Sequence, residues 1–415
     1  MISKLTLKNI GPSEDLDFEF APRINILTGD NGLGKSFVLE CLWWVLTGTW
    51  TAKPVRPEPE AQGSAEMTFC LSEEFDSKSP DSTSVYDSEN GRWQSERGNR
   101  PKDDGLVIYA RVDGGFSISF SRHAYRGRPK QPFILKPEDV WDGTQKSGKG
   151  RLEGFYRDVV SWLQTDAPQA HTLRSMTAML SPQSEKLEFT TPKRVYLDDP
   201  KHHPILRLPY GDVPIAEASA GMRRILALAY IVTWAHHEDV ERSKLLSRPA
   251  SQKRTLILDE VESHLHPEWQ RTIIPSILKA TSSMRNDGGL SSFQFFLTTH
   301  SPLVLASIEP SFEEDRDRLF HFDLKDNKAI VRPIKWAARG NAAYWLTSPV
   351  FGLKEARSIE AEVAIRAAKD FMVQRLDRLP ENLRTKEAIH AELKRTLPGQ
   401  DLFWPRWIVK TGQED

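Results

Sequence analysis

A glycine-rich octapeptide constrains this chain more than any other feature of its sequence. It reads GDNGLGKS and matches the phosphate-binding pattern G-x-x-x-x-G-K-[ST] at every position. Its members are Gly29, Asp30, Asn31, Gly32, Leu33, Gly34, Lys35 and Ser36. In such a loop the backbone N–H groups surround a polyphosphate, the lysine reaches the β- and γ-phosphates, and the serine hydroxyl binds Mg²⁺. An apolar strand precedes the loop (24–27) and an apolar helix follows it (37–46), so we predict a nucleotide-binding site.

The composition excludes several classes of protein. The chain has 415 residues, with 56 Lys and Arg against 57 Asp and Glu, so its net charge does not argue for nucleic acid binding, although a local basic face could still contact DNA. Its 2 cysteines cannot form a disulfide framework. The first residues, MISKLTLKN, lack the apolar core of a signal peptide, and the longest apolar run is too short to span a bilayer. We therefore expect a cytoplasmic protein without a membrane partner.

Buried strands followed by polar side chains recur along the chain. Residues 255–258 are continuously apolar and end at Asp259 and Glu260, and residues 293–297 are soon followed by His300. Strands that alternate with helices and carry polar groups at their carboxyl ends indicate an α/β sheet with the site along that edge. We assign Asp259 to Mg²⁺ and Glu260 to the water that attacks the γ-phosphate, as in phosphate-loop enzymes. His300 is placed to sense or polarise the γ-phosphate.

The remaining segments divide the chain into a head and a tail. We expect residues 1–333 to form the head, in which residues 73–104 are predicted to be a mobile polar insertion and residues 150–215 a helical lobe. Residues 334–415 are predicted to be mainly helical. This tail either docks a partner or packs on its own core.

A second anion site is predicted before a long apolar helix. Ser219 and Gly221 precede the apolar residues 225–235, and a serine cap, a glycine and a helix N-terminus together favour an anion. The adjacent Arg223 and Arg224 have two interpretations. They contact phosphate in another subunit, or they pair with acidic side chains.

Together and in this order, these elements resemble the ABC-type ATPases of the RecF/SMC class, over about residues 1–308. The resemblance implies a P-loop NTPase head of α/β fold, a mixed β-sheet flanked by helices with an inserted helical lobe and a helical tail, which binds ATP and Mg²⁺ and hydrolyses ATP. In that class Ser219 and Gly221 belong to the signature that closes on ATP held by a second subunit. The resemblance thus implies a homodimer or a higher even oligomer, with Lys35, Glu260 and His300 in catalysis.

A narrower resemblance rests on the run DEVESHLHPEWQ, residues 259–270. This run is similar to the D-E-x-E-x-H-L-H-P-x-x-Q run of OLD-like ATPases. With residues 218–224 and the stretch DLFWPRW (401–407), it resembles PtuA-like ATPases of bacterial antiphage defence, the Septu type. That family works with a separate HNH nuclease, so the resemblance implies such a partner. The pair His264 and His266 also fits a metal site, but its place directly after the catalytic acid favours a loop that faces the partner subunit.

Three features depart from these families. The glutamine that many ABC ATPases use as a second Mg²⁺ ligand has no motif here, and Gln62, Gln94 and Gln183 are equal candidates. The sequence has no heptad run that would make the coiled-coil arms of SMC proteins. It also has no carboxylate cluster like that of the OLD nuclease domain, because the pair Asp315 and Asp317 is predicted to be a solvated turn.

Three interpretations of the function stay open. The first is an ATP-driven dimeric switch in antiphage defence whose destructive step belongs to a partner nuclease. The second is a DNA-repair clamp of RecF type, and the third is an OLD-type nuclease with a degenerate active site. The tail residues Phe403, Trp404, Arg406 and Trp407 fit either an interface anchor or packing in the protein's own core.

Overall fold

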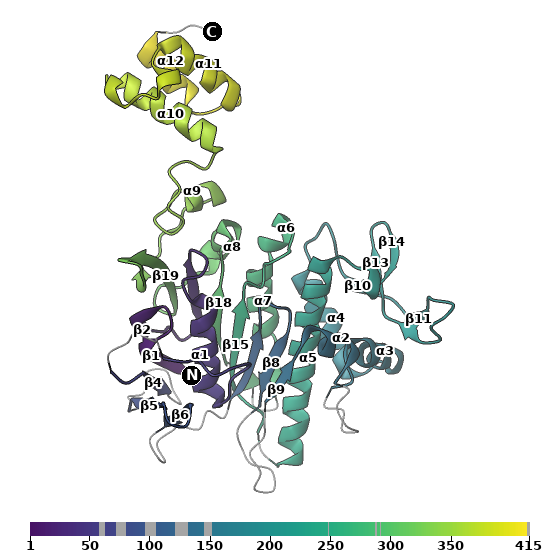
Figure 1. Cartoon of the computed structure of the whole chain (residues 1–415). Helices are drawn as coiled ribbons and strands as arrows, with labels where there is room; N and C mark the ends of the chain where they lie inside the picture. The colour runs from purple at the N-terminus through teal and green to yellow at the C-terminus, as the bar shows by residue number, and fades with distance from the viewer. Residues whose placement is uncertain are drawn as a thin grey trace. The chain divides into compact units, whose positions relative to one another are not determined.

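The chain forms two compact units, Met1–Gly340 and Asn341–Asp415. The computed structural model describes residues 1–57, 63–71, 80–95, 105–120, 132–144, 152–247, 249–286, 289–290 and 292–412. Figure 1 colours them along the chain from purple to yellow. None of the helices in these ranges has the length and apolar character that a bilayer crossing requires.

An eight-stranded mixed sheet forms the centre of the first unit. Its strand order is β20-β19-β3-β18-β15-β7-β8-β9, and the strands from β19 to β7 run parallel to one another. The bounds are β3 Ile24–Gly29, β7 Leu106–Ala110, β8 Phe116–Ser119, β9 Phe133–Leu135, β15 Lys253–Asp259, β18 Ser292–Thr298, β19 Asp317–Lys325 and β20 Lys328–Ile334. Strands β3, β7 and β15 are buried along almost their whole length, because parallel strands are covered on both faces.

The carboxyl ends of three adjacent strands are level with one another. Thr298 at the end of β18 pairs with Asp259 at the end of β15 on one side and with Leu27 of β3 on the other. The phosphate loop begins where β3 ends. The loop, Asp259 and the residues after β18 therefore meet at one edge of the sheet.

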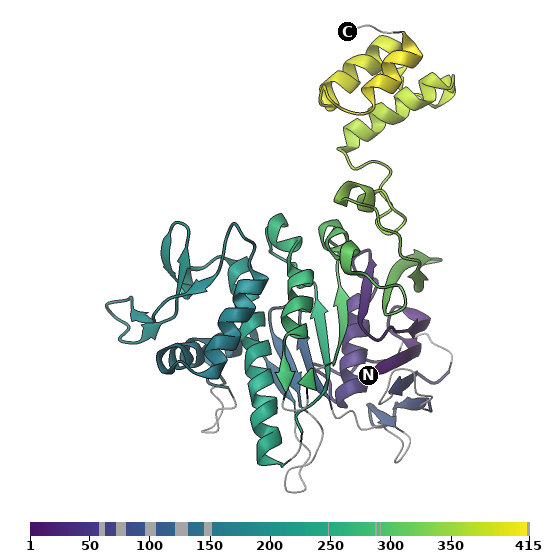
Figure 2. The same cartoon turned by 180° about the vertical axis from the view of Figure 1, so that it is seen from behind.

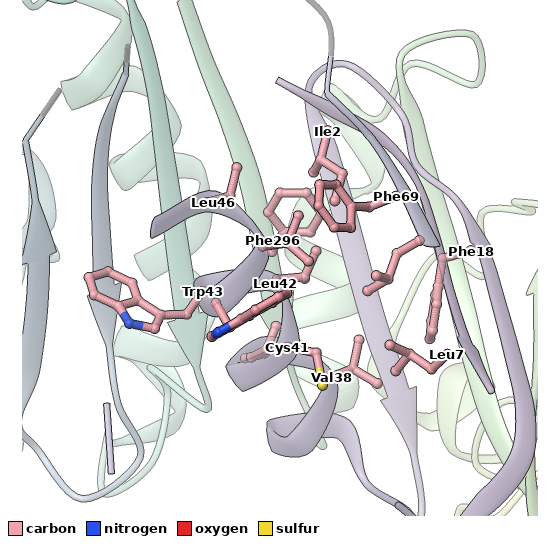
Figure 3. Packing of buried hydrophobic residues seen from close by; sticks show 14 of the residues in the cluster. Ile2, Leu7, Phe18, Val38, Cys41, Leu42, Trp43, Leu46, Phe69 and Phe296 are labelled. Carbon is pink, nitrogen blue, oxygen red and sulfur yellow. The ribbon is translucent and has the colours of Figure 1, made fainter. Parts of the chain in front are cut away.

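Helix α1 (Lys35–Thr47) lies between the large sheet and a five-stranded antiparallel sheet of order β2-β1-β4-β5-β6. Those strands are β1 Ile2–Ile10, β2 Ser13–Glu19, β4 Glu66–Leu71, β5 Ser82–Asp87 and β6 Arg92–Ser95. In Figure 3, Trp43 points from α1 toward the large sheet, while Val38 lies near Leu7 of the smaller one. The helix is apolar nearly all round because it is covered on both sides.

Helices cover the opposite face of the large sheet. Leu256 of β15 lies among apolar side chains of α4 (Pro168–Leu180), α5 (Ala220–Leu245) and α7 (Ile273–Ser282). Seen from behind, the long teal helix α5 and the green helix α7 lie in front of the sheet (Figure 2). The further helices of this unit are α2 Pro137–Asp142, α3 Phe155–Thr165, α6 Pro267–Gln270 and α8 Pro302–Ile308, with 3-10 turns at Ile215–Glu217 and Glu309–Ser311.

The expectation that residues 73–104 form a mobile polar insertion is partly wrong. Its middle forms β5 and β6, which extend the five-stranded sheet at one edge. Trp93 of β6 lies 6.1 Å from the ring of Trp44 in α1, and its indole N–H donates to the carbonyl of Val55. A few aromatic contacts therefore hold two strands whose composition is polar. The rest of the segment lies outside the described residues.

The lobe expected to be helical over residues 150–215 is helical only in its first half. After α4 the chain forms a three-stranded antiparallel sheet and a two-stranded ribbon. These strands are β10 Glu188–Phe189, β13 Ile205–Leu208, β14 Gly211–Pro214, β11 Lys193–Arg194 and β12 His202–His203. Strands this short give no readable alternation of apolar and polar residues, so the sequence pattern missed them. A similar ribbon joins β16 (Arg285–Asn286) and β17 (Gly289–Leu290).

The predicted solvated turn at Asp315 and Asp317 is wrong for the second aspartate. Asp317 starts β19 and is only 1% exposed. Its carboxylate accepts hydrogen bonds from the Arg23 guanidinium at 2.9 Å and from the backbone N–H of Ile24 at 3.1 Å. The buried acid is tolerated because Arg23 neutralises it, and the pair fixes β19 beside β3.

The second unit is a small helical bundle with its own core. It contains α9 Ala342–Leu346, α10 Ile359–Met372, α11 Lys386–Thr396 and α12 Trp404–Thr411, with 3-10 turns at Leu376–Arg378 and Glu381–Leu383. The Ser358 side chain accepts the N–H of Ala361 and so caps α10. Phe403 and Trp407 are buried in this core, whereas Leu402 is 87% exposed. The two aromatic residues therefore pack inside their own unit.

Candidate active site

The phosphate loop joins β3 to α1 through backbone conformations that favour glycine. Gly29 has a φ of 131°, and a Cβ added there would lie 2.2 Å from the carbonyl oxygen of Phe322. Gly34 has a φ of 92° and immediately precedes α1. A loop that turns this tightly into a helix N-terminus offers successive backbone N–H groups to a polyphosphate.

Lys35 is buried at the start of α1 with its ammonium group inside the loop. Its Nζ donates hydrogen bonds to the carbonyl oxygens of Gly29 at 2.9 Å and Asp30 at 2.6 Å. Burial lowers the pKa of Lys35 to about 8, although the nearby carboxylates of Glu260 and Asp259 oppose that shift. A polyphosphate in the loop would add the negative charge that favours the charged ammonium.

Ser36 and Asp259 form a pair of oxygen donors suited to Mg²⁺. The Ser36 Oγ lies 3.1 Å from Asp259 Oδ1. Adjacent ligands of an octahedral Mg²⁺, each roughly 2.1 Å from the ion, are about 3.0 Å apart, so both oxygens fit one coordination sphere. When bound there, Mg²⁺ would neutralise charge on the β- and γ-phosphates. The donor set therefore fits the predicted cofactor.

Two residues that sequence analysis did not single out hold Asp259. Thr298 Oγ1 donates to Asp259 Oδ1 at 2.7 Å, and the Tyr109 hydroxyl in β7 lies 3.5 Å from Oδ2. Burial raises the pKa of Asp259, while the hydrogen bonds from Thr298 and Ser36 oppose the rise. Only the register of β7 and β18 against β15 brings these hydroxyls to the site, so their positions in apolar strands gave no signal.

Glu260 and His300 face each other where β15 and β18 end. Glu260 Oε1 lies 3.1 Å from His300 Nε2, and Ser263 Oγ lies 3.3 Å from Glu260 Oε2. Burial, and then the nearby Lys35 ammonium, lower the pKa of His300, so its imidazole is neutral at pH 7 and donates a hydrogen bond to the carboxylate. A carboxylate held in this way at a half-exposed edge can orient a water and accept its proton.

Glu262 ties the segment after β15 to the segment after β18. Its carboxylate is buried and accepts hydrogen bonds from the Thr299 hydroxyl at 2.5 Å and from the His300 backbone N–H at 3.2 Å. Burial raises the pKa of Glu262, and those hydrogen bonds oppose the rise. The backbone of His300 is therefore held by the second glutamate of the D-E-x-E run.

The signature residues lie away from the phosphate loop of the same chain. Ser219 caps α5, with its Oγ accepting the N–H of Met222 at 3.3 Å, and Gly221 lies in the first turn of that helix. The first turns of α5 pack beside the ends of β7 and β15, whereas the loop follows β3. Strands β18 and β15 lie between β3 and β7. At ordinary strand spacing, β3 and β7 are therefore about 14 Å apart.

The structure thus separates the predicted site residues into two groups. One edge of the sheet collects the phosphate loop with Lys35 and Ser36, together with Asp259, Glu260 and His300. Ser219 and Gly221 form the other group. Gly221 also packs within its own chain, because a Cβ added there would lie 3.0 Å from the carbonyl oxygen of His264.

Several side chains near the site have other partners than the sequence suggested. Arg224 donates to backbone carbonyls, and the Arg223 guanidinium lies 4.6 Å from the centre of the Trp141 ring. Among the described ion pairs, neither arginine pairs with an acid. His266 Nδ1 accepts the N–H of Glu268 at the start of α6. In the parts of the chain that the structure describes, no cluster of His, Cys, Asp or Glu is arranged to hold a metal ion.

Neither of the two glutamine candidates that the structure describes bonds to the Mg²⁺ donors. Gln94 lies on β6 and donates to Asp87 of the five-stranded sheet, while Gln183 follows α4. Gln62 lies outside the described residues. Of the described side chains, Ser36, Tyr109 and Thr298 are those that bond to the carboxylate of Asp259.

Two family profiles match the chain. Residues 4–127 match "AAA domain", and residues 205–306 match "AAA domain, putative AbiEii toxin, Type IV TA system". The first segment contains the phosphate loop. The second contains Ser219, Gly221, Asp259, Glu260 and His300.

Individual relatives are distant. Septu protein PtuA of Bacillus thuringiensis is 21% identical over 380 residues, which cover 86% of each chain. The retron Vc95 probable ATPase of Vibrio cholerae serotype O1 biovar El Tor is 28% identical over 102 residues, 23% of this chain and only 16% of that protein. Among solved structures, the SMC head bound to the C-winged helix domain of ScpA is 15% identical, with a TM-score of 0.44 over 80% of this chain and 97% of that one.

The motifs and the profile matches agree on the chemistry. A phosphate loop, a Mg²⁺ donor pair and a carboxylate beside a histidine meet at one sheet edge, inside segments that match AAA domains. The chain is therefore an ATPase with two segments that match AAA domains, and it is distantly similar to PtuA and to a retron ATPase.

Proposed function

We propose that the protein is an ATP-driven dimeric switch in bacterial antiphage defence, and that a separate nuclease carries out the destructive step. Two subunits close so that each ATP lies between the phosphate loop of one subunit and the Ser219 helix of the other. Glu260 and His300 then direct water onto the γ-phosphate, and hydrolysis releases the subunits. The partner nuclease responds to whether the dimer is closed or open.

The separation of the two groups of site residues carries the proposed dimer. Ser219 at the start of α5 lies on the β7 side of the sheet, and the phosphate loop lies on the β3 side. The Ser219 hydroxyl and the N-terminus of a helix favour an anion, yet no phosphate held by Lys35 of the same chain reaches them. A second copy of the chain in the opposite orientation supplies that phosphate, and two-fold symmetry then completes two equal sites.

The relation to PtuA supports the role in defence. That relation covers 86% of each chain, so it extends beyond the ATPase unit into at least part of the helical second unit. The resemblance of residues 259–270 to OLD-like and PtuA-like ATPases points the same way. We infer an HNH-type nuclease as the partner from the same resemblance.

Co-purification tests the two-component arrangement. The tagged protein, expressed with the product of its neighbouring gene, should form a complex that degrades nucleic acid. The isolated protein should cut neither DNA nor RNA with Mg²⁺ or Mn²⁺. In the complex, Lys35→Ala should change nuclease activity without dissociating the partner, because it removes nucleotide control only.

Two outcomes favour the other interpretations. Cleavage by the isolated protein that survives repeated purification and the Lys35→Ala substitution favours an OLD-type nuclease. ATP-dependent binding to gapped DNA, with no nuclease in the complex, favours a RecF-type clamp.

A further inference from the structure

Arg224 connects the helix that carries the signature to the catalytic segment, residues 259–264, of the same chain. Its Nη2 donates to the carbonyl oxygens of Asp259 at 3.2 Å and Glu260 at 3.0 Å, and its Nε donates to the carbonyl of Val261 at 3.3 Å. Its Nη1 donates to the carbonyl of Val112, just after β7, at 3.2 Å. One guanidinium thus holds consecutive carbonyls of the catalytic segment.

The backbone at Glu260 needs such support. Glu260 has a φ of 46°, in the left-handed region that costs energy for a residue with a side chain. Its N–H donates to Thr298 Oγ1 at 2.9 Å, and its carbonyl accepts from Arg224. The peptide groups on both sides of the catalytic carboxylate are therefore held, and together they determine where that carboxylate points.

The charge of Arg224 suits this position. Its guanidinium lies near the carboxylates of Glu262, Asp259, Glu260 and Asp113, yet its hydrogen bonds go to backbone oxygens. It therefore offsets the repulsion among these acids while their carboxylate oxygens stay available for Mg²⁺ and water. A lysine could supply the charge, but its single nitrogen cannot span four carbonyls in fixed geometry.

A second contact makes the helix start and the catalytic segment one block. Gly221, one turn before Arg224, packs against the carbonyl of His264 so closely that an added Cβ would lie 3.0 Å from it. The first turns of α5 therefore cannot move independently of residues 259–264.

We propose that Arg224 is a positioning residue for hydrolysis, through which the first turns of α5 set the orientation of Glu260 in the same chain. In the proposed function, on which this point rests, that helix start also closes on the nucleotide of the other subunit. Closure on that nucleotide would therefore orient Glu260 at the nucleotide site of its own chain.

Three measurements on Arg224→Gln test this role: ATP affinity, turnover at saturating ATP, and ATP-dependent dimer formation. We expect ATP affinity within about threefold of wild type, a turnover at least about tenfold lower, and normal dimer formation, because a small misplacement of a catalytic group costs rate and not binding. Arg242→Gln is the matched control. That arginine lies near the other end of α5, pairs with Glu238 and stacks on Phe120, so its loss should leave turnover within about twofold.

A double variant shows whether Arg224 acts through Glu260. The turnover of Arg224→Gln combined with Glu260→Gln should equal that of Glu260→Gln alone within about twofold, because the residue to be positioned is already disabled. Multiplied defects would overturn the proposal, as would normal turnover in Arg224→Gln. If Arg224→Gln does not fold, Arg224→Lys is judged by the same criteria.

The remaining outcomes separate this inference from the proposed function. An Arg224→Gln protein that binds ATP but no longer forms the ATP-dependent dimer would show that the guanidinium contacts the other subunit, and would overturn the positioning role. A wild-type protein that hydrolyses ATP as a monomer would refute the dimeric switch. In that case a slow Arg224→Gln variant still supports positioning of Glu260, and a variant of normal rate still refutes it.

Discussion

Ser36 Oγ and Asp259 Oδ1 lie 3.1 Å apart although 223 residues separate them in the chain. The contact joins the start of α1 to the end of β15, and it brings the proposed Mg²⁺ donors together from the two segments that match AAA domains. Because Glu260 follows Asp259 directly, the same junction places the proposed base next to the proposed ion. Binding and chemistry therefore depend on different residues only a few ångströms apart.

Substitutions at Glu260 and Lys35 should separate chemistry from binding. Glu260→Gln should bind ATP with near wild-type affinity but hydrolyse it about 10² to 10³ times more slowly, because it keeps the hydrogen-bonding shape and loses the base. Lys35→Ala should instead lose ATP affinity by about tenfold or more. Equilibrium binding and single-turnover hydrolysis distinguish the two. An equal loss of ATP affinity in both variants would contradict this division of roles.

ATP binding should take up a proton at alkaline pH. Burial holds the pKa of Lys35 at about 8, below its value in the unfolded chain, and the ammonium must be charged to hold phosphate. Binding should therefore take up close to one proton at about pH 9 and only about a tenth of one at pH 7, and affinity should fall as pH rises through 8. Calorimetry with a non-hydrolysable ATP analogue, in buffers of different ionisation enthalpy, measures this uptake.

The lowered pKa of Lys35 also makes the free energy of unfolding depend on pH. Between about pH 8 and the unfolded-state pKa of Lys35, the unfolded chain binds more protons than the folded one, so this group makes the protein more stable as pH rises.

Lys35→Arg is the control for the binding experiment, because a guanidinium stays charged over this range. A proton uptake that persists unchanged in Lys35→Arg would assign the effect to another group.

The second unit should depend on Trp407 for its stability. This side chain is fully buried, packs near Ile389 and Leu393 and donates from Nε1 to His390 Nδ1 at 3.2 Å. Trp407→Ala should lower the free energy of unfolding of this unit by about 3 to 5 kcal/mol. Val409→Ala on the same helix, at a position 81% exposed, should change it by less than about 0.5 kcal/mol. Denaturant unfolding compares the two, and similar small losses would refute the packing role.

Local chemistry was predictable from the sequence, while contacts between distant segments were not. The glycine pattern specifies the loop, and apolar runs that end in Asp259 and before His300 specify the sheet edge, because each signal lies within one short stretch. The Tyr109 and Thr298 hydroxyls at Asp259 depend on strand register, which no single stretch encodes. Asp317 had the sequence context of a solvated loop because its partner Arg23 lies 294 residues earlier.

Arg224 illustrates the same limit for a charged side chain. The sequence suggested a phosphate or an acid as its partner, since those are the usual partners of arginine. Its partners are backbone carbonyls, exposed by the left-handed turn at Glu260. A backbone conformation that tertiary contacts impose cannot be inferred from residue types.

A mixed-dimer experiment tests the composite site, on which the proposed function depends. Lys35→Ala damages the phosphate loop. Ser219→Asp damages the signature by placing a carboxylate where the other subunit's phosphate would lie, yet it still caps α5, because aspartate is a good N-cap. Ser219→Asn keeps the cap without the charge, so its defect should be smaller than that of Ser219→Asp. Each damaged homodimer should be inactive.

The deciding measurement is the ATP turnover of the two inactive variants after they are co-refolded in equal amounts. Random pairing puts about half of the subunits in mixed dimers, in which one of the two sites keeps an intact loop and an intact Ser219 helix. Turnover should therefore recover to about a quarter of wild type, or less if the sites must act together. In parallel, the Ser219→Asp protein alone should bind ATP as a monomer with wild-type affinity. Turnover that stays at the level of the separate variants while mixed dimers form, together with loss of ATP binding by the Ser219→Asp monomer, would contradict a site shared between subunits.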